Sequence, residues 1–211
     1  MLMIWRWSLL SSLIVAASMA GPSGYASAQN RTIAPALRSN DLEALLWPAG
    51  ARQAADHHGA VLTPAALRGR IAVVSFVAPD CSIVCVVRTM DLDKVARALP
   101  DRLRRRVAFL AVSLSDAPVE NGSLRTFGEG VVGADTPLHF VATDPARSAA
   151  IAAMLRYPWG HRPEPPPQIL LFDRQGGIAM AYGGERLDQP RLAEDIAVLD
   201  TFAQGLDAPP G

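Results

Sequence analysis

The chain has 211 residues, of which 50% are apolar, and its 20 basic residues balance its 20 acidic residues. A chain of this size and composition can bury one substantial core, which excludes an intrinsically disordered protein. The balanced charge argues against a nucleic-acid partner.

The first 28 residues have the pattern of a secretory signal peptide. Arg6 precedes an apolar run over residues 9–20, and a small-residue Ala-Ser-Ala sequence ends at Ala28. The run is shorter than the roughly 20 apolar residues of a membrane-spanning helix. We therefore expect cleavage after Ala28 and export to the periplasm, with membrane contact only if this segment is retained as an anchor.

Residues 29–58 are expected to form an N-terminal extension. Within this extension, residues 41–46 have a short helical pattern, which a proline and a glycine end. The core domain is expected over residues 59–205, followed by a flexible tail over residues 206–211.

The first half of the core domain alternates between strand and helix patterns. Residues 64–67 predict a turn of helix, and residues 71–77 form a continuous apolar run rich in β-branched side chains. Such a run is typical of a central strand that is covered on both faces. From Asp80 to about Leu99 the pattern is helical, with one apolar face formed by Val84, Val87, Leu92, Val95 and Leu99.

The second half of the domain continues this alternation and ends in a hairpin. Further strands are predicted over residues 107–114, 138–143, 168–173 and 178–184. Further helices are predicted from about residue 123, over residues 144–156 and over residues 190–203. This order predicts an α/β fold with a mostly parallel central sheet, an antiparallel edge hairpin and helices on both faces.

The only two cysteines of the chain, Cys81 and Cys85, follow the first core strand where the next helix begins. Backbone N–H groups and the helix dipole at such a position stabilise a thiolate. A thiolate is both the nucleophile of disulfide exchange and a ligand of Cu(I). Four helical residues rise about 6 Å, which a disulfide tolerates. A static structural disulfide is the alternative, although such a short loop constrains the unfolded chain little.

Pro167 immediately precedes the strand "QILLFD". In folds with a dithiol between a strand and a helix, a proline that starts this strand, often in the cis form, packs against the cysteine pair. A simple role in ending the preceding loop is the alternative.

The segments "GAVLTPAALRGRIAVVSFVAPDCSIVC", "TDPARSAAIAAMLR" and "QILLFDRQGGIAMAYGG", with the final helix, resemble the SCO/SenC family over roughly residues 59–203. Proteins of this family have a thioredoxin-like fold and act as copper and thiol factors in cytochrome oxidase assembly. The resemblance implies that Cys81 and Cys85 are a copper-binding, redox-active pair that can form a disulfide. It also implies that the partners are the oxidase subunit with the copper site, or other thiol proteins.

Two positions depart from the family pattern. Val86 stands where the family usually has a proline after the second cysteine. The family's third copper ligand is a histidine at a position that corresponds to about Pro165 in this chain. His161, four residues earlier in the same loop, is the only candidate to replace it.

The functional alternatives stay open at this point. The chain is expected to be a Cu(I) carrier, a thiol-disulfide reductase or both. The missing histidine favours the reductase. A peroxiredoxin is a weaker interpretation, since Ser82 lies three residues before Cys85 but Pro79 is one residue away from the expected proline position. His57 and His58 are expected to be exposed turn residues, and His139 a packing residue.

Overall fold

The computed structural model describes residues 41–47, 54–160, 164–184 and 186–206. The predicted signal peptide, residues 1–28, lies outside the described residues, as does most of the predicted C-terminal tail. Within the described part of the chain, no helix combines the length and the apolar character needed to cross a membrane.

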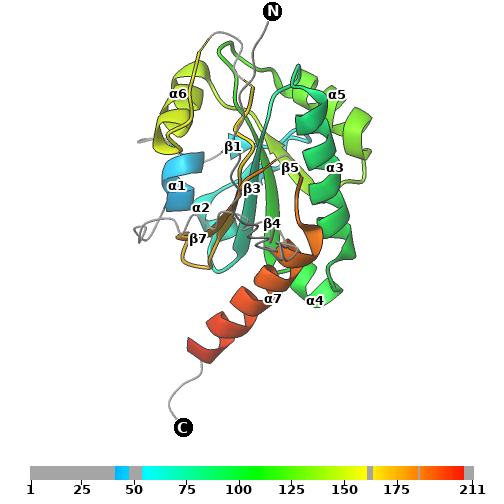
Figure 1. Ribbon diagram of the computed structural model, residues 1–211, viewed down its shortest axis with the longest axis vertical. Helices are drawn as coiled ribbons and strands as arrows, with labels where there is room; N and C mark the ends of the chain where they lie inside the picture. The colour runs from blue at the N-terminus through cyan, green and yellow to red at the C-terminus, as the bar shows by residue number, and fades with distance from the viewer. Residues whose placement is uncertain (1–40, 48–53, 161–163, 185, 207–211) are drawn as a thin grey trace, which may run out of the picture.

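The central sheet has five strands in the order β5-β4-β3-β6-β7 (Figure 1). Strand β3 pairs in parallel with β4, and β4 pairs in parallel with β5. Strand β6 is antiparallel to both β3 and β7 and so forms the hairpin that ends the sheet. The predicted mixed sheet with an antiparallel edge hairpin is confirmed. The strands are β3 (Ile71–Val77), β4 (Val107–Ser113), β5 (Leu138–Val141), β6 (Ile169–Phe172) and β7 (Ile178–Tyr182).

Helices cover both faces of this sheet, as predicted. In Figure 1, α1 and α6 lie on one side of the sheet, whereas α3 and α5 lie on the other. A short two-stranded sheet, β1 (Ala54–Ala55) with β2 (Val61–Leu62), precedes β3. The helices are α1 (Asp41–Leu46), α2 (Pro64–Leu67), α3 (Ile83–Ala98), α4 (Asp101–Arg104), α5 (Asn121–Val132), α6 (Pro145–Met154) and α7 (Gln189–Leu206).

Strands β3 and β4 are buried along their whole length, because both lie in the middle of the sheet. Their alternate side chains enter two separate cores. On one face, Val73 and Phe109 pack with apolar side chains of α3, α5 and α7. On the other face, Val74 and Leu110 pack with apolar side chains of α1, α2 and α6. A strand that is covered on both faces favours apolar residues at successive positions, and Ser75 in β3 and Ser113 in β4 are the only polar residues of these two strands.

Helix α1 belongs to this second core although it lies in the segment expected to be an extension. Leu42, Leu45 and Leu46 are buried on the sheet. The Arg147 side chain of α6 donates two hydrogen bonds to the Leu45 carbonyl oxygen, at 3.1 and 2.8 Å. These contacts join the N-terminal segment to the domain.

The apolar face predicted for the helix after the cysteines is wrong over its first two turns. Val84 and Val87 are exposed, whereas Cys85, Arg88 and Thr89 are buried. Because apolar residues surround the beginning of this helix on all sides, periodicity alone does not fix which side faces the sheet. In the structure, Cys85 faces the core between α3 and the sheet and is bonded to Cys81.

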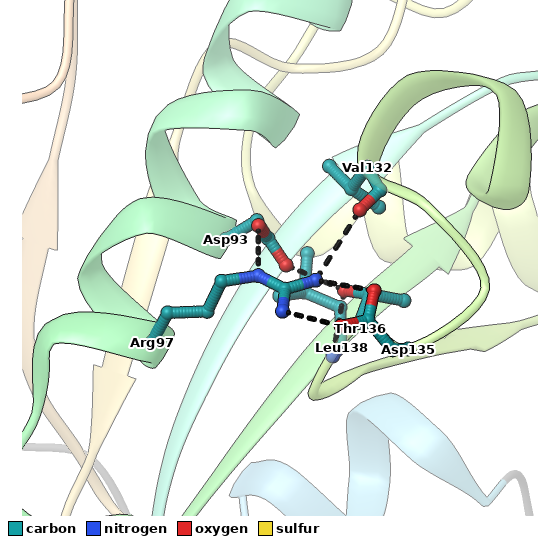
Figure 2. Close-up of polar contacts among 6 residues, drawn as sticks. All are labelled: Asp93, Arg97, Val132, Asp135, Thr136 and Leu138. Carbon is teal, nitrogen blue, oxygen red and sulfur yellow. Dashed lines mark hydrogen bonds and ion pairs between the residues drawn. The ribbon is translucent and has the colours of Figure 1, made fainter.

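The second half of α3 is held by a polar network around Arg97 (Figure 2). Its guanidinium donates to Asp93 at 2.7 Å and to both carboxylate oxygens of Asp135 at 3.0 and 3.1 Å. Thr136 donates to the same Asp93 at 2.7 Å and accepts from the Leu138 backbone N–H at 3.2 Å. The network links α3 to the connection between α5 and β5, so that α3 has a fixed position beside the sheet.

Candidate functional site

The two cysteines lie at the carboxyl end of β3, where the chain leaves the sheet and enters α3. Ala78 is buried, and its carbonyl oxygen accepts a hydrogen bond from the Cys81 backbone N–H at 3.1 Å. Ser82 is the N-cap residue of α3 and has an extended backbone conformation. The first helical hydrogen bond runs from the Val86 N–H to the Ser82 carbonyl oxygen at 3.2 Å. The turn thus places Cys81 just before the helix and Cys85 within its first turn.

A disulfide joins Cys81 to Cys85, with 5.9 Å between their Cα atoms. Cys81 is half-buried, whereas Cys85 is 1% exposed and belongs to the core between the sheet and α3. The carbonyl oxygen of Cys85 also accepts a hydrogen bond from the buried Thr89 hydroxyl at 3.0 Å. Cys81 is therefore the more exposed of the two cysteines, while Cys85 is enclosed in the core.

Glu164, in the loop before β6, contacts the turn between β3 and α3. Its carboxylate accepts from the Ser82 N–H at 3.1 and 3.2 Å and from the Ser82 hydroxyl at 2.6 Å. The two residues are 82 positions apart in the chain. The contact ties the loop before β6 to the turn that carries the disulfide, and it places a carboxylate beside Cys81.

Arg88 lies one helical turn after Cys85 and is buried, which is unusual for an arginine. Burial lowers the pKa of its guanidinium, although the nearby Glu164 and Tyr157 raise it in part. The guanidinium donates to the Gly184 carbonyl oxygen at 3.3 Å. A buried cation thus lies on the inner side of the helix that carries the disulfide.

Pro167 is half-buried and lines a small pocket together with Arg88, Ile169 and Tyr182. The structure therefore brings it to the inner side of α3, at Arg88. The described residues contain no cis peptide bond, so the peptide bond before Pro167 is trans. Pro165, at the position of the family's histidine, is buried. His161, the candidate replacement, lies outside the described residues.

The remaining histidines form a cluster on the outer edge of β5, away from the disulfide. His57 was expected to be exposed, but it is completely buried, because its N–H donates to the Phe140 carbonyl oxygen at 2.9 Å and the histidine thus joins the sheet edge. His58 is exposed as expected, and its ring lies 3.8 Å from the His57 ring. His139 pairs with the carboxylate of Asp56 at 2.8 Å.

The ionisation of this cluster follows from its burial and its hydrogen bonds. Burial, with the nearby His58, lowers the pKa of His57. Burial alone would raise the pKa of Asp56, but hydrogen bonds from His139 and from the Ala60 and His58 backbone N–H groups lower it overall. Among the described residues, no group of three or more His, Cys, Asp or Glu side chains is arranged so that it could hold a metal ion.

Sequence reasoning thus identified the disulfide pair but missed two residues beside it. The first of them is Arg88, which the structure buries. Its spacing of three residues from Cys85 is a local signal that places it near the pair on a helix. Glu164 had no such signal, because its contact with Ser82 depends on the folding of a distant loop.

Comparison with solved structures identifies the fold. No protein-family model matches the chain, and no curated protein sequence matches it. Solved structures do match. The structure of Bradyrhizobium japonicum ScoI with copper bound is 19% identical, with 71% of this chain and 98% of that chain covered and a TM-score of 0.57. A SCO1/SenC family lipoprotein from Bacillus anthracis is 16% identical, with 70% and 92% covered and a TM-score of 0.58.

A third similar structure is that of a different kind of protein. A secreted disulfide oxidoreductase from Mycobacterium tuberculosis is 20% identical, with 74% of this chain and 98% of that chain covered and a TM-score of 0.50. The similarity extends over nearly the whole of each solved chain. The fold of this chain is therefore the thioredoxin-like fold that SCO/SenC proteins share with thiol-disulfide oxidoreductases.

Proposed function

We propose that this chain is a divergent SCO/SenC protein, exported to the periplasm, in which Cys81 and Cys85 exchange disulfides with client thiols and bind Cu(I) when reduced. The single observation that carries the proposal is the disulfide at the β3–α3 junction, with Cys81 half-buried and Cys85 enclosed. A disulfide that closes so short a loop adds little stability through chain entropy. A chemical role accounts for it better than a structural one.

The exchange reaction follows from the different burial of the two sulfurs. A client thiolate attacks the Cys81 sulfur, the Cys81–Cys85 bond breaks, and Cys85 leaves as a thiolate that takes up a proton. A second client thiolate then attacks the client sulfur of the mixed disulfide and releases Cys81. The client is oxidised to a disulfide and the protein is reduced to its dithiol. The reverse sequence reduces a client disulfide.

The reduced pair is suited to carry Cu(I) as cargo. Two thiolates from residues whose Cα atoms lie 5.9 Å apart are soft donors, which Cu(I) prefers. The carboxylate of Glu164, beside Ser82, is a hard oxygen donor and is unsuited to Cu(I). The expected client is the copper-site subunit of cytochrome oxidase, since the chain resembles the SCO/SenC family.

A general periplasmic thiol-disulfide oxidoreductase without a copper role is the second candidate. The observation that favours it is Pro165, which stands at the position of the family's histidine ligand and is buried. A histidine at this position would supply the nitrogen donor that Cu(II) prefers, and a proline supplies none. The two candidates therefore differ in whether the reduced protein binds copper tightly.

An anaerobic titration of the fully reduced protein with Cu(I), in competition with a chelator, tests the copper role. We expect one tightly bound Cu(I) per chain, which is lost when both Cys81 and Cys85 are changed to serine. His161→Ala should leave the affinity for Cu(I) nearly unchanged. Tight binding that survives the double serine variant would contradict the assignment of the ligands, and no tight binding by the parent protein would favour the second candidate.

A further inference from the structure

The outer face of α3 exposes apolar side chains next to the disulfide. Ile83 is 72% exposed, Val84 37%, Val87 39% and Met90 40%. We call these four residues the α3 stripe. They are half of the eight large apolar side chains that the described residues expose. Because single exposed apolar residues are common but groups of them are not, the stripe needs an explanation.

The same two turns of α3 carry polar side chains on the inner face. Arg88 and Thr89 are buried, and the carboxylate of Asp93 is buried a turn later. Exchange of the inner and outer residues would give the usual amphipathic helix, with its apolar residues on the core. The apolar outer face is therefore not a consequence of packing within this domain.

The α3 stripe begins two residues after Cys81, the more exposed cysteine of the disulfide. A thiol that approaches Cys81 from solvent therefore comes close to the exposed Ile83. Two exposed carboxylates flank this approach, namely Asp80 before the cysteine and Glu164 on Ser82. Among the cations that the structure describes near this turn, Arg88 is buried and Arg186 lines the small pocket next to Tyr182 of β7.

We propose that the α3 stripe is the docking surface for the client segment that carries the exchanging cysteine, and that this segment has aliphatic and basic side chains around its cysteine. The inference rests on the proposed exchange function and specifies the partner of the same site. Aliphatic client side chains would cover the stripe, and the basic ones would lie near Asp80 and Glu164.

The size of the stripe sets the length of the client segment. From Ile83 to Met90 the helix rises about 10 Å at 1.5 Å per residue. An extended segment covers this distance with about three residues at 3.3 Å each. The client therefore needs only a short aliphatic and basic stretch directly beside its cysteine. The two carboxylates disfavour an anionic membrane surface as the occupant, because like charges repel.

Exchange rates of the oxidised full-length protein with synthetic cysteine peptides test this inference. Three peptides of equal length carry leucine and lysine, serine and lysine, or leucine and glutamate beside the cysteine, and glutathione serves as a small thiol that needs no docking. We expect the leucine–lysine peptide to react about five- to tenfold faster than either other peptide. Its advantage over the glutamate peptide should shrink as ionic strength rises from about 0.01 M to 1 M.

Matched surface variants separate docking from general effects. Val87→Ser and Met90→Ser should each lower the rate with the leucine–lysine peptide about threefold to fivefold and leave the glutathione rate unchanged. Val198→Ser on α7 and Met154→Ser on α6 are the controls, since these side chains are 40% and 44% exposed but lie on other helices. Both control variants should leave every rate unchanged.

The outcomes distinguish a failure of the docking surface from a failure of the exchange function. If glutathione reduces the disulfide but the three peptides react equally fast, or the control variants slow exchange as much as Val87→Ser and Met90→Ser do, the docking surface is wrong and the exchange function stands. If neither glutathione nor any peptide exchanges with Cys81, the exchange function fails, and the docking inference fails with it.

Discussion

Gly128 and Gly130 of α5, only two residues apart, should differ in how replacement by alanine changes the stability of the protein. A Cβ atom added at Gly128 would lie 2.8 Å from the Cε2 atom and 3.0 Å from the Cδ2 atom of the Phe140 ring. A Cβ atom added at Gly130 meets no atom within 4 Å. Both residues lie within the helix, so the gain from replacing glycine by alanine, about 1 kcal/mol, applies to both.

The ring of Phe140 has little freedom to move away from a new methyl group. It is completely buried and makes edge contacts with the rings of Phe127 and His57, at centroid distances of 6.0 and 5.0 Å. Overpacking of such a site costs about 1–3 kcal/mol. With the gain in helix propensity, Gly128→Ala should lower the free energy of unfolding by about 0–2 kcal/mol, whereas Gly130→Ala should raise it by about 1 kcal/mol.

Urea unfolding of the two variants and the parent protein measures this difference. The midpoint should fall or stay constant for Gly128→Ala and rise for Gly130→Ala, with about 1–3 kcal/mol between the two variants. In thermal unfolding, 1 kcal/mol corresponds to about 2–4 °C for a domain of this size. Equal stabilisation by both substitutions would refute the close packing of α5 on Phe140.

Three further predictions concern acid stability, thiol reactivity and processing. Burial lowers the pKa of His57 in the folded protein below its ordinary value of 6.5, so on acidification the imidazole is protonated in the unfolded chain before it is protonated in the folded chain. The free energy of unfolding is therefore unaffected by this group above about pH 6.5 and decreases as the pH falls below that value. Urea midpoints at pH 7.5 and 5.5 should show this loss, which a His57→Gln variant reduces, and an unchanged midpoint in the parent protein would contradict it. In the reduced protein, Cys81 should be alkylated faster than Cys85 because it is less buried, as peptide mass mapping can show; equal rates would argue against an enclosed Cys85. The exported protein should begin at Gln29, and a mass that includes residues 1–28 would show a retained segment instead.

Local patterns were sufficient to predict the sheet. The run over residues 71–77 is apolar except for Ser75, and the structure buries it in the middle of the sheet over the same residues. The helix predicted over residues 144–156 is also confirmed as α6, whose N-cap Asp144 accepts from the Arg147 N–H at 2.8 Å. Both features depend on residues that are neighbours in the chain, and such features are visible in a sequence.

The surroundings of the cysteine pair could not be predicted in the same way. Tertiary contacts determine which side of α3 faces the sheet. They bury Arg88, whereas the neighbouring apolar side chains of Val84 and Val87 are exposed. His57 is buried because β1 and the residues after it lie against the edge of β5, as the pairing of Asp56 with Val141 shows. The carboxylate of Glu164 reaches Ser82 across a separation of 82 residues. Each of these positions depends on contacts between segments that are distant in the chain. The local periodicity of a single sequence does not reveal such contacts.

The most direct test of the central claim is a redox titration of the Cys81–Cys85 pair. The protein is equilibrated in thiol–disulfide buffers of graded potential, the free thiols are alkylated, and the fraction of doubly alkylated chain is measured by mass. We predict a reversible two-electron transition at a potential above about −300 mV, where exchange with client thiols is feasible. A disulfide that stays closed at all potentials down to and below that value would show that the pair is structural, and would contradict the account.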